Sequence, residues 1–188
     1  MRIEPANLSW QEAHDLIGNV IAPLPIAFIS TVGPDGTYNA APFSFVAPVC
    51  SKPPIVCVSI GLRKGEKKDT LINIEYSQDF VVNVVDENLT EAVRICGQYS
   101  GREIDKFKHA KLTPVKGLKV NAPCIEESPL SLECKVVKQI PTGDHVWFIG
   151  EVQSTTIRND YDWKNGLLFK WVGENGFFYE VGNKVGEY

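Results

Sequence analysis

Several basic side chains lead directly into a predicted helix start, in the segment 63–70. It reads Arg-Lys-Gly-Glu-Lys-Lys-Asp-Thr, and an apolar helical pattern follows. The first turn of a helix has free backbone N–H groups and a partial positive charge, so it binds anions. Arg63 and Lys68 would add charge, Asp69 or Thr70 would cap the helix, and the Thr70 hydroxyl would add a donor. The segment predicts a phosphate site, although a solvated basic loop would have the same composition.

A second candidate segment, 39–44, combines small side chains with polar ones. A broad, flat ring system needs small side chains to lie against and backbone N–H and C=O groups along one edge. Ala40 and Ala41 would supply the room, and Asn39 and Ser44 the polar contacts. A polar strand edge with a proline break would read the same way. The residues of this candidate ring wall are Asn39, Ala40, Ala41, Pro42, Phe43 and Ser44.

The third candidate is the turn Gly143-Asp144-His145, which introduces a strand. A histidine donates from either ring nitrogen and changes charge near neutral pH, so His145 could orient a nucleotide or move a proton. The alternative is a turn in which Asp144 only caps the entry to the strand. His145 is the candidate catalytic residue of the chain.

The motifs resemble those of the FMN-binding split-barrel family, in its flavin reductase-like, flavoredoxin-type branch. They are N-A-A-P-F-S-F at 39–45, S-x-P-P at 51–54 and R-K-x-x-K-K-D-T-L-x-N-I at 63–74. The segment 24–31 and the turn 143–145 also match, so the resemblance covers roughly residues 15–182. It implies a mainly β fold: a split β-barrel with peripheral helices, as a single domain over 1–188. It also implies a homodimer, because sites in this family often include residues from the second subunit.

The resemblance implies FMN as the cofactor. On this interpretation segment 39–44 forms the wall beside the ring, and Arg63, Lys68, Asp69 and Thr70 hold the phosphate. Ser30 and Thr31, at the end of the first strand, also contact the flavin. The implied reaction passes a hydride from NADH or NADPH to the flavin, and then electrons to a protein or small-molecule acceptor.

Two other functions remain open at this point. One is an FMN electron carrier of the flavoredoxin kind, without NAD(P)H activity of its own; the other is a flavin-binding module without a redox role. FAD or riboflavin could also replace FMN. The sequence has no G-x-G-x-x-G motif and no Walker A motif, so a nicotinamide cofactor would have to dock directly over the flavin.

Composition sets further limits. The net charge of −4 and a pI near 5.4 argue against broad nucleic-acid binding, which needs a basic face. The start of the chain has no apolar signal region, and no stretch approaches the roughly 20 apolar residues of a membrane span. The cysteines number five and form no C-x-x-C pair, which favours reduced, mostly buried thiols and no metal site. We therefore expect a cytoplasmic protein that binds neither membranes nor nucleic acid.

The periodicity of the chain predicts many strands and few helices, which is typical of a barrel. Ser9 and Glu12 form a capping box for a helix over 9–19 whose apolar face includes Trp10 and Ile17. His14 lies on this helix and is expected to be a surface or half-buried residue. Further helices are expected at 69–76 and at 89–99, the latter capped by Asn88. Strands are expected at 26–32, from 37 onward, and at 55–60, 80–85, 130–140, 145–155, 167–172 and 176–181.

Overall fold

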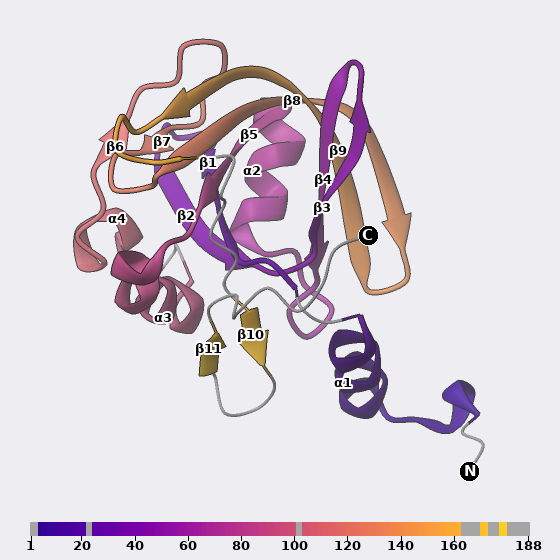
Figure 1. Ribbon diagram of the computed structural model, residues 1–188. Helices are drawn as coiled ribbons and strands as arrows, with labels where there is room; N and C mark the ends of the chain where they lie inside the picture. Colours follow the sequence, from indigo (N-terminus) through magenta and orange to yellow (C-terminus); the bar gives the residue numbers. More distant parts are fainter. Residues whose placement is uncertain (1–3, 22–23, 101–102, 163–169, 173–176, 180–188) are drawn as a thin grey trace, which may run out of the picture.

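The computed structural model describes residues 4–21, 24–100, 103–162, 170–172 and 177–179. Its main feature is one strongly curved antiparallel sheet of seven strands, in the order β2-β1-β5-β8-β9-β4-β3 (Figure 1). The strands are β1 (Ala27–Val32), β2 (Tyr38–Phe43), β3 (Val46–Ser51), β4 (Pro54–Gly61), β5 (Asp79–Val84), β8 (Leu130–Thr142) and β9 (His145–Ile157).

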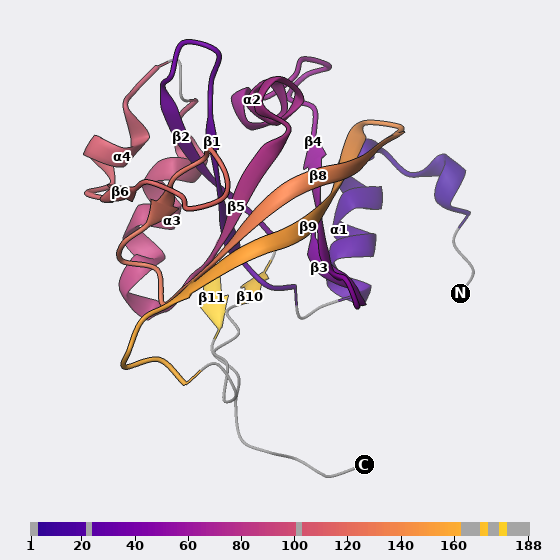
Figure 2. The same cartoon turned by 90° about the horizontal axis from the view of Figure 1, so that it is seen from above.

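Helices surround this sheet or close its end (Figures 1 and 2). They are α1 (Trp10–Val20), α2 (Asp69–Ser77), α3 (Thr90–Gln98) and α4 (Lys106–His109), with 3-10 turns at Pro5–Asn7 and Glu87–Leu89. Two short strand pairs complete the described structure: β6 (Pro114–Val115) with β7 (Cys124–Ile125), and β10 (Lys170–Val172) with β11 (Phe177–Tyr179). No helix in the described ranges is long and apolar enough to cross a membrane.

The two edge strands of the sheet, β2 and β3, follow each other directly in the chain. The sheet must therefore curl until its first strand reaches its last. Between these strands the Phe45 carbonyl accepts a hydrogen bond of 2.8 Å from the Ser59 N–H of β4. The result is a barrel that is split between β2 and β3, since these two strands are not neighbours in the hydrogen-bonded order.

The inside of the barrel is filled by apolar side chains and closed by α2. Leu71 and Ile74 of α2 are fully buried and pack in one cluster with Ile29 and Phe80. On β9, a Cβ atom at Gly150 would lie 2.6 Å from the Phe80 ring, so the strand passes directly against this ring. The tight interior fixes α2, and with it the residues at its N-terminus.

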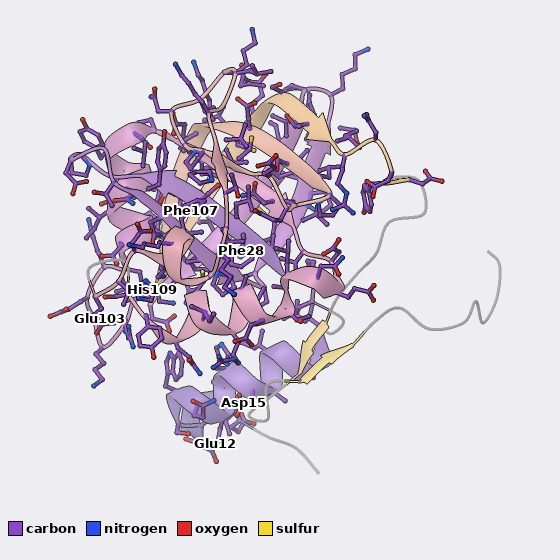
Figure 3. The ribbon with its side chains drawn as sticks, turned by 90° about the vertical axis from the view of Figure 1, so that its left-hand side faces the viewer. Glu12, Asp15, Phe28, Glu103, Phe107 and His109 are labelled. Atoms are coloured by element: carbon purple, nitrogen blue, oxygen red, sulfur yellow. The ribbon has the colours of Figure 1, made fainter. Side chains whose placement is uncertain are left out.

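A second apolar cluster lies on the outer face of β1 and β2, under α3 and α4. Phe28 of β1 and Phe107 of α4 belong to it, and Figure 3 shows the two side chains close together. Because Ile29 points into the barrel and Phe28 points outward, β1 is buried on both faces. This double burial explains the uninterrupted apolar run at 26–29 in the sequence.

The predicted fold class is confirmed: the structure is a mainly β barrel with peripheral helices. The capping box of the first helix is also confirmed, since the Ser9 side chain accepts from the Glu12 N–H and Glu12 accepts from the Ser9 N–H. The predicted terminal hairpin is present where β10 pairs with β11, while the rest of 167–181 lies outside the described residues.

The apolar face of α1 is largely exposed in this chain, since Ile17 is 53% exposed and Val20 is 73% exposed. Two predicted helix caps were wrong. Helix α2 begins at Asp69 as expected, but its N-cap is Lys68 and not Asp69 or Thr70. Helix α3 has Leu89 and not Asn88 at its N-cap and no capping side chain, while Asp86 caps the preceding 3-10 turn by accepting a hydrogen bond from the Asn88 N–H.

Strand β3 was not predicted at all. Its sequence contains Pro48, which usually argues against a strand, and most of its residues are exposed. Proline is tolerated there because β3 is an edge strand with one free side.

Candidate functional site

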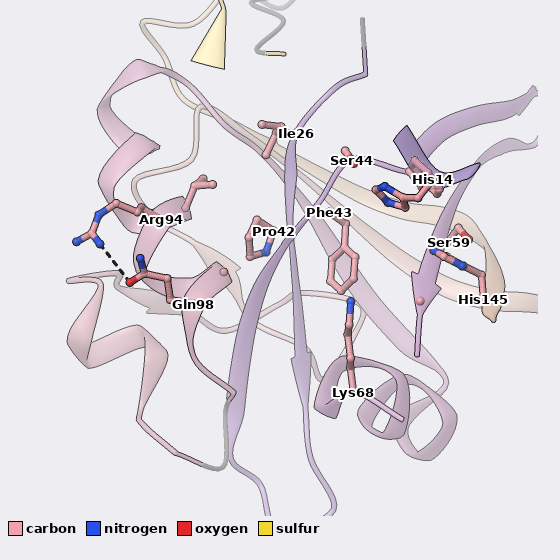
Figure 4. Close-up of a pocket in the computed structure, with 14 residues that line it drawn as sticks. His14, Ile26, Pro42, Phe43, Ser44, Ser59, Lys68, Arg94, Gln98 and His145 are labelled. Carbon is pink, nitrogen blue, oxygen red and sulfur yellow. Dashed lines mark hydrogen bonds between the residues drawn. The ribbon is translucent and has the colours of Figure 1, made fainter. Parts of the chain in front are cut away.

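A cavity of about 740 Å³ opens at the split in the barrel, where β2 leads toward β3. Its walls come from the ends of β2 and β4, from α1 and α3, and from the turn between β8 and β9 (Figure 4). The lining residues are His14, Ile26, Pro42, Phe43, Ser44, Phe45, Ser59, Gly61, Lys68, Val93, Arg94, Gly97, Gln98 and His145.

One wall of the cavity is the end of β2. Pro42, Phe43 and Ser44 line it, and Gly97 of α3 faces Pro42 closely enough that a Cβ atom there would lie 3.5 Å from the proline ring. The wall therefore comes from the later residues of segment 39–44, and not from Ala40 and Ala41, whose small side chains were expected to make room for a ring. It is the part of the predicted ring wall that reaches the cavity.

Lys68 brings a cation to this wall from the start of α2. Its ammonium lies 5.6 Å from the centre of the Phe43 ring, and Figure 4 shows the side chain reaching toward that ring. Burial, and after it the charge of Arg63, lowers the pKa of Lys68. A bound anion would compensate for both effects, so the position favours a negatively charged group.

Four near-parallel rings form a column along the opposite side. Trp10 stacks on His14 with ring centres 5.1 Å apart, His14 on Phe45 at 6.0 Å, and Phe45 on His145 at 5.6 Å. These spacings lie within the usual range for offset aromatic contacts. We name Trp10, His14, Phe45 and His145 the ring column; it joins α1 to the barrel beside the cavity.

His145 is held on several sides. Its Nδ1 lies 2.9 Å from the Asp144 carboxylate, which also accepts a hydrogen bond from the Trp10 indole N–H. The Asp144 carbonyl accepts from the Leu62 N–H at 2.8 Å, which ties the turn to the end of β4. The imidazole lies against Gly61, where a Cβ atom would be 2.8 Å from Nε2. A side chain at position 61 would therefore displace the ring.

The cavity is locally basic although the chain is acidic. Its charged lining residues are Lys68 and Arg94, and no carboxylate of the described residues lines it. Arg94 is bound on its outer side by Glu91 and donates to Gln98 at 3.1 Å. An anionic ligand suits this lining.

Five of the predicted site residues line the cavity: Pro42, Phe43, Ser44, Lys68 and His145. Four others are buried polar residues with partners inside the fold. The Ser30 hydroxyl donates to the Pro123 carbonyl, Thr31 accepts from Asn73, and Asn39 donates to Thr70. A contact of Ser30, Thr31, Asn39 or Thr70 with a cofactor stays a prediction.

The remaining predicted residues also lie outside the cavity lining. Ala40 is fully buried in the cluster under α3 and α4, and Ala41 is buried on the next position of β2. Arg63 lies in the turn before α2, and Asp69 is the first residue of α2, directly after Lys68. Their roles likewise stay predictions.

Several residues that line the cavity were not predicted as site residues. His14 was expected only as a surface or half-buried residue; it is half-buried and lines the cavity. Ser59 and Gly61 belong to an apolar strand and were not predicted as site residues. Their spacing of two, which places both on one face of β4, is the only sequence feature that indicates a shared location.

The chain belongs to the flavin reductase-like family, since the family model described as "Flavin reductase like domain" matches residues 21–171. An uncharacterized protein of Aquifex aeolicus is 39% identical over 137 residues, which cover 72% of this chain and 70% of the relative.

Solved structures agree with this family and with the predicted split barrel. The crystal structure of nitrilotriacetate monooxygenase component B from Bacillus cereus matches with a TM-score of 0.91 and 25% identity, over 100% of this chain and 98% of that one. Flavoredoxin of Desulfovibrio vulgaris (Miyazaki F) matches with a TM-score of 0.77 and 25% identity, over 100% of this chain and 97% of that one. The fold is also shared by a putative flavin reductase with a split barrel domain from Shewanella frigidimarina. Its TM-score is 0.81 and its identity 18%, over 100% of this chain and 98% of that one.

The contact between Trp10 and Asp144 leads to a pH-dependent prediction. The Trp10 hydrogen bond, and after it His145, lowers the pKa of Asp144 below its usual value near 3.9. A lowered carboxyl pKa stabilises the fold above the unfolded-state pKa, and this contribution disappears as the pH falls through the folded-state pKa. Trp10→Phe should therefore be less stable than the wild type at pH 7, and the difference should shrink below about pH 4.

Denaturant unfolding of both proteins between pH 7 and pH 3 measures this difference. In an Asp144→Asn background, where position 144 no longer titrates, the effect of Trp10→Phe should not vary over this range. A pH-independent effect in the wild-type background would show that the carboxylate is not the source of the stabilisation.

Proposed function

We propose that the cavity binds flavin mononucleotide and that the protein is a flavin-dependent oxidoreductase. It would pass electrons from NADH or NADPH to the flavin and on to an acceptor. The observation that carries this proposal is a basic cavity at the split of a flavin reductase-like barrel, with Pro42, Phe43 and Ser44 on one wall and a cation at a helix start nearby. An absorption spectrum of the purified protein, and identification of any released cofactor, tests it directly.

The residues present fit such a ligand. The volume lies within the range of 300–1,000 Å³ that is common for cofactor and ligand sites. Gly61 and Gly97 keep two walls close to the backbone. The Ser59 hydroxyl is buried in the lining without a hydrogen-bond partner among the described residues, so a polar ligand atom would have a place to bind.

The start of α2 would hold the phosphate. A nine-residue helix begins at Asp69, and the free N–H groups of its first turn would face the anion together with the Lys68 ammonium. Arg63 lies close enough for its charge to lower the pKa of Lys68. The same proximity would let both cations share one phosphate dianion.

A bound flavin would supply the hydride and electron transfer chemistry. The chain's own contribution is placement. Pro42, Phe43 and Ser44 would lie along one side of the ligand, and His14, Phe45 and His145 of the ring column would lie along the other side. His145, fixed by Asp144, would orient the electron donor or move a proton at its Nε2 edge.

A second function deserves a test because flavoredoxin is among the similar structures at 25% identity. In that case the protein would hold its flavin permanently and exchange electrons with a protein partner. Stopped-flow mixing with NADH and with NADPH separates the two functions. Rapid bleaching of the flavin supports the reductase, and its absence with both donors supports the carrier.

The phosphate site can be tested with the double variant Arg63→Ala/Lys68→Ala. Charge-assisted hydrogen bonds contribute about 1.5–3 kcal/mol each, so the affinity for FMN should fall by at least ~10-fold. Riboflavin, which lacks the phosphate, should lose much less. Fluorescence titration with both ligands measures this difference. Equal losses for the two would exclude these residues as the phosphate site.

The role of His145 can be tested with His145→Ala. If the imidazole orients the donor, flavin content and thermal midpoint stay near those of the wild type while the bimolecular reduction rate falls. If His145 only closes the turn, stability falls and the rate per bound flavin does not change. Single-turnover reduction and thermal unfolding of the same preparation distinguish these outcomes. His109→Ala, at an exposed histidine on α4, is the matched control.

We also propose that the protein is a homodimer in which α1 packs on the second copy. The outer face of α1 has an exposed apolar surface, on which Trp10 is 58% exposed, Ile17 is 53% exposed and Val20 is 73% exposed. Contiguous apolar surfaces of this kind mark interaction sites in soluble proteins. Since α1 also carries His14 into the cavity lining, the assembly would stabilise one wall of the site.

Sedimentation velocity tests the dimer. The wild type should sediment as a dimer, and Ile17→Lys should shift it toward the monomer because a charge would be buried in the interface. Leu118→Lys, at an apolar residue 78% exposed in the loop before β7, should leave the dimer intact. A wild-type protein that sediments as a monomer over the accessible concentrations would exclude the proposal.

A further inference from the structure

Residues 106–125 concentrate positive charge in an otherwise acidic chain. They include five lysines and no aspartate or glutamate, whereas the whole chain has a net charge of −4. Lys106 is buried and the other four are exposed. The exposed ones are Lys108, Lys111, Lys116 and Lys119. None of these four forms an ion pair with a described residue, so their charges are available to a partner.

The second part of this stretch, residues 112–125, is held on the sheet by buried side chains; we name it the strap. The Lys119 N–H donates to Glu133 of β8 at 2.6 Å, and the Asn121 N–H donates to Asp79 of β5 at 2.8 Å. Glu133 is fully buried and Asp79 is 3% exposed. Hydrogen bonds to carboxylates are among the stronger ones, so the strap has a defined conformation before any partner binds.

The outer side of the strap presents an apolar tip between lysines. Leu118 is 78% exposed, the highest value for a large apolar side chain among the described residues, and Lys116 and Lys119 flank it in the chain. The inner side of this turn is closed, because a Cβ atom at Gly117 would lie 2.8 Å from the Val120 carbonyl oxygen. A rigid leucine bordered by cations has the character of a protein interface, with an apolar centre and a charged rim.

An acidic protein fits this surface better than a nucleic acid does. The strap contains no arginine and no aromatic side chain on which a base could stack. Leu118 gains little against a phosphate backbone, whereas an apolar site on a protein would remove it from water. The lysines would pair with carboxylates around that site and would steer the approach of an acidic partner.

The strap is connected to the cavity through one apolar cluster. Leu112, the first residue of the strap, belongs to the same buried cluster as Ile26 and Val93, and both of these line the cavity. Figures 1 and 2 show β6 and β7, the strands of the strap, on the opposite side of the sheet from β3 and β4. A protein docked on the strap would therefore reach the cavity from the side of α3 and α4.

We propose that the strap is the docking surface for an acidic protein that accepts electrons from the reduced flavin. This inference rests on the proposed function and deepens it by naming the class of acceptor. The two-electron-reduced flavin would be oxidised, two one-electron acceptor molecules would each be reduced in turn, and the protons would pass to water. The lysines would steer the acceptor, and Leu118 would be buried in the contact.

The test uses flavin-loaded protein, reduced stoichiometrically with dithionite and mixed by stopped flow with cytochrome b5, an acidic acceptor, or cytochrome c, a basic one. In Lys116→Glu/Lys119→Glu the rate of cytochrome b5 reduction at low ionic strength should fall by roughly ten-fold or more, because attraction becomes repulsion. The rate of cytochrome c reduction should rise. Both effects should shrink at about 1 M salt, where the Debye length is about 3 Å.

Lys52→Glu/Lys138→Glu is the matched control. It changes the net charge by the same amount at exposed lysines outside the strap and the cavity lining, so both rates should change much less. A cytochrome b5 rate that is unchanged in the strap variant, or that falls equally in both variants, would overturn the inference. Strap-dependent binding of a single-stranded DNA oligonucleotide without an effect on cytochrome b5 would also overturn it.

Flavin content and thermal midpoint show whether the strap variant remains folded. If Lys116→Glu/Lys119→Glu does not fold, Lys116→Gln/Lys119→Gln takes its place, because it removes the two charges without adding new ones. Its effects on the two cytochromes should have the same signs and a smaller size. Rates equal to those of the wild type in this folded variant would exclude the strap as the docking surface.

The proposed function and this inference can fail separately. If flavin binds and is reduced by a nicotinamide donor, and the strap variant reduces cytochrome b5 at the wild-type rate, only the docking surface is excluded. If the protein binds no flavin, calorimetric titration of the flavin-free protein with cytochrome b5 compares the same variants. Binding that only the strap variant weakens would then support the surface while excluding the flavin proposal.

Discussion

The structure depends on the closure of one antiparallel sheet at the point where β2 leads to β3. Its first and last strands are consecutive in the chain, so the segment between them must span the split. The hydrogen bond from the Ser59 N–H to the Phe45 carbonyl fastens this segment to β4. The backbone that would otherwise pair with a neighbouring strand is thereby left at the edge of a cavity. The same arrangement of β2 and β3 that closes the barrel therefore also forms one wall of the cavity.

The second constraint is the packing of α2 in the end of the barrel. Leu71 and Ile74 are fully buried, so the axis and register of the helix are set by the apolar core. The N-terminus of α2 and the Lys68 side chain follow from that register. Burial of Lys68 beside Arg63 is unfavourable for its charge in isolation. Such a cost is typical of sites that are arranged for a ligand of opposite charge.

The sequence predicted the fold class and most elements because these depend on local periodicity and on motifs. It predicted Pro42, Phe43, Ser44, Lys68 and His145 as neighbours in one site, and they line one cavity. It missed β3, because an exposed edge strand containing Pro48 has no strand signature. It also missed Ser59 and His14. Their importance depends on which residues from other strands and helices meet them, and no local pattern records such long-range contacts.

Helix α1 is another element whose role depends on long-range contacts and not on its local sequence pattern. Its apolar stripe was correctly predicted as one face of a helix. The periodicity gives the direction of that face and not what covers it, and in the structure the face is largely exposed. An isolated helix of eleven residues is only marginally stable in water. Trp10 and His14 therefore anchor the helix as much as they shape the cavity. Contacts that hold α1 in place also hold the cavity wall that carries His14, so the stability of this helix and the shape of this part of the cavity depend on the same contacts.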